Sequence, residues 1–160
     1  MMITKENDMR DFTVSEVLEY SRNIEMESYN FYKAVYADVS SPELKELALE
    51  LAEEELKHFN LISTLLEKGH LTSIDMDHVI QIKKEDINHL VATKDLPADP
   101  TPLSILETAY NRELRTESIY RTLLSFTDLA KNIIDTFSML VAQEKGHATR
   151  IKSIMNNYSS

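Results

Sequence analysis

The chain has 160 residues, which is enough for one domain with a buried core. It contains only two glycines and four prolines, which favours helices, and it contains no cysteine, which excludes disulfides, thiol catalysis, iron–sulfur clusters and Cys-ligated zinc. The net charge of −10 repels nucleic acid and anionic membranes and attracts cations. No apolar run is long enough to cross a membrane, and residues 1–10 lack the apolar core of a signal peptide, so we expect a cytoplasmic protein.

The first predicted helix spans residues 13–38 and follows a polar stretch, residues 1–11, that we expect to be frayed. Thr13 is the predicted N-cap, and Glu16 completes a capping box with it. Apolar residues then recur at helical spacing, and Glu25 lies within this apolar stripe.

The second predicted helix spans residues 42–68. Ser41 precedes it as the N-cap, and Gly69 is the predicted stop. Its apolar stripe contains Glu55 and His58, which are three residues apart and therefore on one face of the helix.

Residues 69–101 are too many for a hairpin loop and are rich in Asp, His and Pro. The pattern allows one short helix near residues 83–93. An extended segment of this length can return along a helix of about 40 Å. We therefore expect a long crossover, after which the third helix begins at the end of the molecule opposite to the end of the second.

The third and fourth predicted helices span residues 102–125 and 128–156. Thr101 and Pro102 open the third helix, whose apolar stripe contains Glu113. The stripe of the fourth helix contains Glu144 and His147, again three residues apart.

An internal repeat relates the two halves of the chain. A shift of about 88 or 89 residues aligns Glu25 with Glu113, and Glu55 and His58 with Glu144 and His147. The sequence thus predicts two helical hairpins related by a pseudo-twofold axis. Each hairpin supplies one lone glutamate and one Glu-x-x-His pair.

These six residues predict a dinuclear metal site in the bundle interior. Carboxylates in an apolar stripe cost several kcal/mol each when they have no counter-charge, whereas two divalent ions would balance the four glutamates. A partly hydrated polar core is the alternative. A further Glu-x-x-His at Glu67 and His70 is rejected because it spans the glycine that ends the second helix.

Oxygen-rich ligation with two imidazoles and no thiolate favours iron or manganese over structural zinc. Tyr32 and Tyr120 follow the lone glutamates by seven residues each. They are candidates to donate hydrogen bonds to the ligating carboxylates, and the alternative is that they are ordinary core tyrosines.

The motif from Ile24 to Tyr32, Ile24-Glu25-x-x-Ser28-x-x-Phe31-Tyr32, resembles the first-helix signature of rubrerythrin-type ferritin-like proteins. Leu51-Ala52-Glu53-Glu54-Glu55-x-x-His58 resembles their second-helix ligand motif, and the other three candidate ligands match the third and fourth helices of the wider ferritin-like class. The resemblance covers residues 13–156.

This resemblance implies an all-α ferritin-like four-helix bundle with one long crossover between the second and third helices. It implies two iron ions as cofactors, with manganese or a mixed-metal pair as alternatives. Two features differ from rubrerythrins: the chain lacks the four cysteines of a rubredoxin-like domain, and Thr116 occupies the position where rubrerythrins carry an extra carboxylate.

The implied function is a di-iron oxidoreductase that reacts with peroxide or dioxygen and takes its electrons from an external donor protein. Three alternatives stay open: an iron-handling ferroxidase or storage protein, an oxygen-activating hydroxylase with an apolar channel to the metals, and a metal-free interaction module. We also expect a homodimer, because the first and third helices carry apolar and tyrosine residues outside their stripes, namely Tyr20, Tyr29, Tyr36, Ile105 and Tyr110.

Overall fold

The structure is a computed structural model that describes residues 8–67, 71–91, 96–126 and 128–158, of which residues 88–91 are described in their backbone only. In chain order its elements are β1 (Met9–Thr13), α1 (Val14–Asp38), α2 (Pro42–Glu67), α3 (Ser73–Asp77), β2 (Val79–Lys83), α4 (Lys84–Val91), α5 (Pro102–Leu124) and α6 (Lys131–Tyr158).

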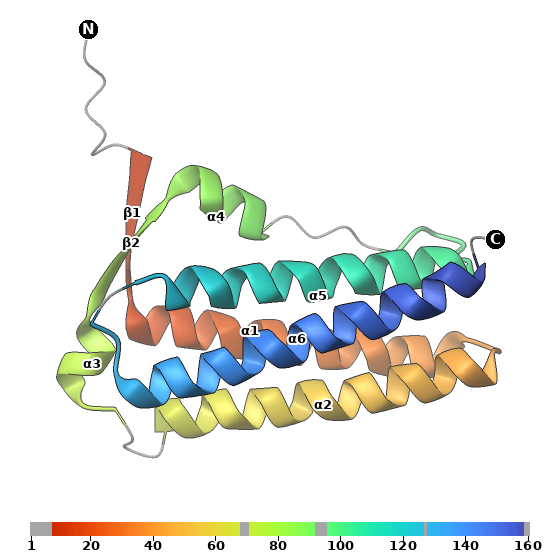
Figure 1. The fold of residues 1–160 in the computed structure, drawn as a ribbon, viewed down its shortest axis with the longest axis horizontal. Coiled ribbons are helices and arrows are strands. Elements are labelled where there is room, and N and C mark those ends of the chain that lie inside the picture. The colour runs from red at the N-terminus through yellow and green to blue at the C-terminus, as the bar shows by residue number, and fades with distance from the viewer. Residues whose placement is uncertain (1–7, 68–70, 92–95, 127, 159–160) are drawn as a thin grey trace, which may run out of the picture.

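Four long helices form the body of the molecule (Figure 1). Helices α1 and α2 pack together as one antiparallel hairpin and α5 and α6 as another, while α1 also contacts α5 and α2 contacts α6. Because α2 and α5 run in the same direction, the chain between them returns to the other end of the bundle. The predicted all-α bundle with one long crossover is confirmed.

The N-terminal ends of the helices follow the capping signals in the sequence. At α1, the Glu16 backbone N–H donates to Thr13 Oγ1 at 3.1 Å, and the Thr13 backbone N–H donates to the Glu16 carboxylate at 3.1 Å. Thr101 caps α5 in the same way, with Ser104 as its partner. At α2, the Leu44 N–H donates to Ser41 Oγ at 3.4 Å.

Helix α6 begins at Lys131, not at residue 128 as the sequence pattern predicts. Asp128 has a φ of 67°, a left-handed conformation that a right-handed helix does not contain, so the helix begins after it. The predicted stop of α2 at Gly69, together with Lys68 and His70, lies outside the described residues.

The prediction that residues 1–11 are frayed is wrong for residues 9–11. They belong to β1, which pairs antiparallel with β2 so that Phe12 lies opposite Ile80. Ile80 is 1 % exposed and joins the bundle core, which fixes the pair at the end of the bundle. The crossover also contains α4, which corresponds to the short helix that the pattern allowed near residues 83–93.

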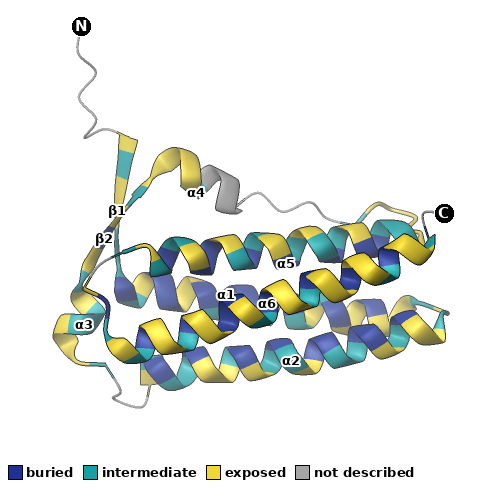
Figure 2. Cartoon of the chain, in the orientation of Figure 1, coloured by how far each residue is buried: buried dark blue, intermediate teal, exposed yellow. Residues whose placement is uncertain are grey.

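Burial follows the predicted stripes, since the buried residues of each long helix face the interior of the bundle (Figure 2). The core forms two main apolar clusters. On α2, Leu51 belongs to one cluster and Ile62 to the other; on α6, Ile151 and Leu140 divide in the same way. The candidate ligands on both helices lie between these residues in the sequence, so apolar layers flank them above and below.

One surface expectation is wrong. Ile105 is 7 % exposed and packs against Val35 and Ala48, so it belongs to the core and not to an outer patch. Tyr20 and Tyr36 are exposed, and the homodimer stays a prediction. No helix in the described part of the chain combines the length and apolar character that a membrane crossing needs.

Candidate metal centre

The four long helices bring all six predicted ligands to one place in the bundle interior. Helix α1 supplies Glu25 and α5 supplies Glu113, while α2 and α6 each supply a Glu-x-x-His pair. Three residues are a little less than one helical turn, so the carboxylate and imidazole of each pair point into the same space.

The ligand atoms fall into two groups, within each of which they lie no more than 4.8 Å apart. The first group contains Glu25 and His58, and the second contains Glu113 and His147. Glu55 and Glu144 belong to both groups. This arrangement offers two adjacent candidate metal positions that have two carboxylates in common.

The two imidazoles present their Nδ1 atoms to the carboxylates. His58 Nδ1 lies 2.8 Å from Glu144 Oε1 and 3.5 Å from Glu25 Oε2. His147 Nδ1 lies 3.1 Å from Glu55 Oε1 and 3.5 Å from Glu113 Oε2. The two rings stack with centroids 5.7 Å apart and an interplanar angle of 14°.

Burial and mutual repulsion perturb the glutamates. Desolvation and then the charge of Glu113 raise the pKa values of Glu55 and Glu144 well above 4.5. For Glu113 itself, burial acts to raise the pKa, but the interactions with Glu144, with the His147 imidazole and with the Tyr32 hydroxyl outweigh burial and lower it. The raised pKa values favour the protonated forms of Glu55 and Glu144, so a metal ion would compete with protons for these two carboxylates.

The site contains polar atoms that the protein leaves without hydrogen bonds. One carboxylate oxygen of each of the four glutamates is buried and has no hydrogen-bond partner, and the same is true of His147 Nδ1. Buried polar groups are normally satisfied, so such a concentration needs an explanation. Divalent ions at the two positions would satisfy these oxygens and this nitrogen together, and the donor set fits such ions.

Each tyrosine donates a hydrogen bond to the lone glutamate of the opposite half of the chain. Tyr32 Oη donates to Glu113 Oε1 at 2.5 Å, and Tyr120 Oη donates to Glu25 Oε1. The seven-residue spacing places each tyrosine two turns from the glutamate of its own helix. Because α1 and α5 run antiparallel, the same spacing places it beside the glutamate of the other helix.

Thr116 contributes no ligand. It is buried, but its hydroxyl donates to the Arg112 carbonyl of the preceding turn at 3.0 Å. The position at which rubrerythrins carry an extra carboxylate is thus occupied here by a hydroxyl that bonds to its own helix.

Gln143 is a residue of the site that the sequence pattern did not reveal. Its Oε1 lies 2.5 Å from Nε2 of His58, on the ring edge opposite to the carboxylates. The internal repeat gave no signal for it, because the residue 89 positions earlier is Glu54.

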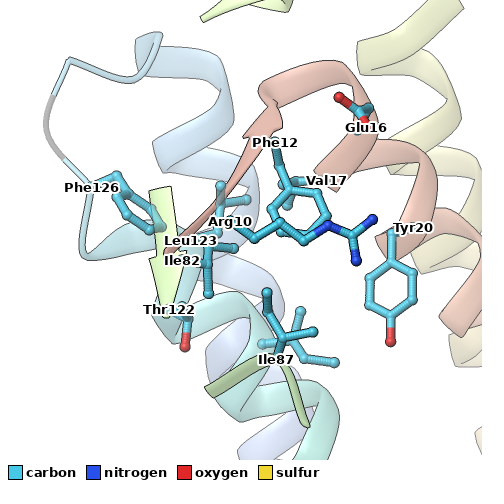
Figure 3. Close-up of a pocket in the computed structure, with 11 residues that line it drawn as sticks. Arg10, Phe12, Glu16, Val17, Tyr20, Ile82, Ile87, Thr122, Leu123 and Phe126 are labelled. Atoms are coloured by element: carbon cyan, nitrogen blue, oxygen red, sulfur yellow. The ribbon is translucent and has the colours of Figure 1, made fainter. Parts of the chain in front are cut away.

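A separate cavity of about 270 Å³ lies where β1, β2 and α4 cover the ends of α1 and α5 (Figure 3). Its lining is largely apolar and includes Phe12, Ile82 and Leu123. The Arg10 guanidinium also lines it and lies 5.0 Å from the centre of the Phe12 ring. None of the six candidate ligands lines this cavity, so it is not an extension of the metal centre.

Comparisons with known proteins agree with this geometry. A search of curated proteins found no match. Among solved structures, a protein from Thermotoga maritima described as a ferritin-like diiron-carboxylate protein superposes with a TM-score of 0.75. It is 18 % identical, and the match covers 94 % of this chain and 99 % of that one, which shows that the fold is ferritin-like. The family model named Rubrerythrin matches residues 16–155, a span that includes every candidate ligand. The chain therefore belongs to the rubrerythrin family.

Proposed function

We propose that this chain is a di-iron carboxylate oxidoreductase that reacts with peroxide or dioxygen and receives its electrons from a separate donor. The observation that supports the proposal is the pair of ligand groups that share Glu55 and Glu144. Two adjacent ions with shared carboxylates suit a two-electron reaction of a small oxidant better than a structural role does, because a structural metal needs only one closed position.

Iron bound here would supply electrons and Lewis acidity. The chain itself supplies orientation and a dry environment. Tyr32 and Tyr120 hold the two lone glutamates by hydrogen bonds, so these carboxylates keep a fixed direction toward the metal positions. The apolar clusters on either side exclude bulk water. The sequence contains no cysteine, so an electron-transfer centre of the rubredoxin kind must lie outside it.

The experiment begins with protein stripped of metal by a chelator and reconstituted anaerobically with Fe(II). Two ions per chain are expected by metal analysis. Addition of peroxide should oxidise this iron faster than free Fe(II), and a small electron-transfer protein should then sustain turnover. Glu144→Gln should abolish the reaction, whereas Glu54→Gln, at a position 42 % exposed on α2, should not affect it. Oxidation no faster than that of free Fe(II) would refute the proposal.

Ferroxidation with iron storage is the alternative that uses the same residues. It predicts that excess Fe(II) and dioxygen load many more than two ferric ions per chain and that the native protein is a large assembly. Light scattering and the iron-to-protein ratio distinguish the two functions. An oxygen-activating hydroxylase needs an apolar route to the metals, and the cavity in Figure 3 does not supply one, since the candidate ligands do not line it.

A further inference from the structure

The contact between His58 and Gln143 assigns a role to each nitrogen of the His58 ring. Nε2 faces Gln143 Oε1 at 2.5 Å, and Nδ1 faces the carboxylates. An amide oxygen only accepts hydrogen bonds, so Nε2 carries the hydrogen. When a metal replaces the proton on Nδ1, the ring keeps this tautomer and presents the Nδ1 lone pair to the ion.

His147 has no such support. The residue that corresponds to Gln143 in the other half is Glu54, whose side chain is 42 % exposed and whose Oε1 lies 3.9 Å from Lys57 Nζ. Within the described part of the chain, Glu54 makes no hydrogen bond or ion pair with either imidazole. Among the described residues, none donates to or accepts from Nε2 of His147. The internal symmetry that holds for the six ligands therefore fails for the groups that orient the two histidines.

The two halves also differ in access. The His58 side chain is 1 % exposed, whereas that of His147 is 11 % exposed. A surface hollow of about 460 Å³ lies between α5 and α6, the helices that carry Glu113 and His147. Its lining includes Leu114 and Ala148, the residues that directly follow these two ligands. The second metal position thus lies on the more open side of the bundle.

We propose that the two metal positions are inequivalent: Gln143 fixes His58, so the Glu25–His58 position holds its ion tightly, and the Glu113–His147 position exchanges its ion. This inference rests on the proposed function, because it assumes that the six side chains bind two ions. Loss of a hydrogen bond that orients a ligating histidine typically lowers metal affinity 10–100-fold. We expect a comparable difference between the two positions in the native protein.

The test titrates metal-free protein with Co(II) and follows binding by calorimetry and by the cobalt absorption bands. The native protein should bind two ions in two steps whose affinities differ at least tenfold. Gln143→Leu should weaken the tight step at least tenfold and leave the weak step in place. Gln143→Glu should restore the tight step, because a carboxylate also accepts from Nε2–H. Glu54→Gln, at the equivalent position of the repeat, should change neither step.

A second measurement does not depend on any variant. In the Co(II) protein the ring N–H protons of ligating histidines are paramagnetically shifted, and their exchange with D₂O can be followed by NMR. One such proton, that of His58, should exchange slowly, and that of His147 should exchange fast.

The outcomes separate the two claims. Two ions bound in one step, two fast-exchanging protons, or a tight step that survives Gln143→Leu would overturn the inequivalence while the dinuclear site stands. Equal weakening of both steps by Gln143→Leu would also overturn it, since Gln143 would then act on the whole fold. A protein that binds no metal would overturn both this inference and the proposed function.

Discussion

The Glu144→Gln variant should be more stable than the native protein without metal and less stable than the native protein with metal. Glu144 is fully buried, and one of its oxygens has no hydrogen-bond partner. Gln has nearly the same shape and keeps an oxygen that can accept from His58 Nδ1, which lies 2.8 Å from Glu144 Oε1. The substitution therefore removes a charge and creates no cavity.

The sign follows from the pKa of Glu144, which burial and then the charges of Glu113 and Glu55 raise well above 4.5. A raised pKa means that the folded protein holds the proton more tightly than the unfolded chain does. The contribution of this group is fully present below pH 4.5 and is lost as the pH rises through its folded pKa. Gln does not titrate, so its advantage over Glu should be small at pH 5 and larger at pH 8.

At pH 8 we expect metal-free Glu144→Gln to be about 2 kcal/mol more stable than the native protein, within the few kcal/mol that a buried uncompensated charge costs. For a domain of this size, that corresponds to a rise of about 4–8 °C in Tm. With metal at 100 times its Kd, the native protein should gain about 2.7 kcal/mol per site, and the variant should gain far less.

The assay is thermal and urea unfolding at pH 5 and pH 8, each with and without Co(II). Glu54→Gln serves as the control for loss of an acidic residue from the same protein, since Glu54 is 42 % exposed. Two results would refute the view that this carboxylate is held in the core for a metal. One is a metal-free Glu144→Gln variant that is less stable than the native protein at pH 8. The other is a variant whose free energy of unfolding rises with Co(II) as much as that of the native protein.

Three further substitutions test other parts of the structure. Tyr32→Phe removes the only hydrogen bond to Glu113 Oε1 that the described residues supply, so it should lower metal affinity about 10–100-fold. Calorimetry measures this affinity, and Tyr36→Phe, at an exposed position, should leave it unchanged. Ile80→Ala in β2 should lower the free energy of unfolding, measured with urea, by about 2–5 kcal/mol. Ile74→Ala, at a side chain 85 % exposed, should lower it by less than about 0.5 kcal/mol. Equal effects would show that the strand pair does not support the bundle. Gly146→Ala should raise stability by about 0.5–1 kcal/mol with unchanged metal content, because a Cβ at this helical position meets no atom within 4 Å.

The sequence was sufficient to locate the six candidate ligands because helix geometry converts spacing into direction. An apolar stripe shows which face is buried, and a Glu or His within that stripe must point inward. The repeat then relates one half to the other without any knowledge of the contacts between them. Local sequence also identified Thr13 as the cap of α1 and Thr101-Pro102 as the start of α5, since such signals depend on residues only a few positions apart.

Features that depend on contacts distant in sequence were not accessible in this way. The pairing of residues 9–13 with 79–83 joins two short segments that have no strong periodicity of their own. The partner of each tyrosine depends on the antiparallel register of α1 and α5, which no single helix reveals. Gln143 lies beside the ligand stripe and has no counterpart in the repeat, so neither signal identified it.

The shared carboxylates also determine how the two positions influence each other. Glu55 and Glu144 belong to both ligand groups, and both have raised pKa values in the metal-free protein. If the site holds two ions as proposed, the first would compete with protons for these carboxylates and would fix groups that the second also needs. The second ion would then meet a site already deprotonated and oriented, although the charge of the first ion would oppose its approach. The shared pair couples the two positions but favours neither, and under the proposed inequivalence the contact between Gln143 and His58 would make the Glu25–His58 position fill first.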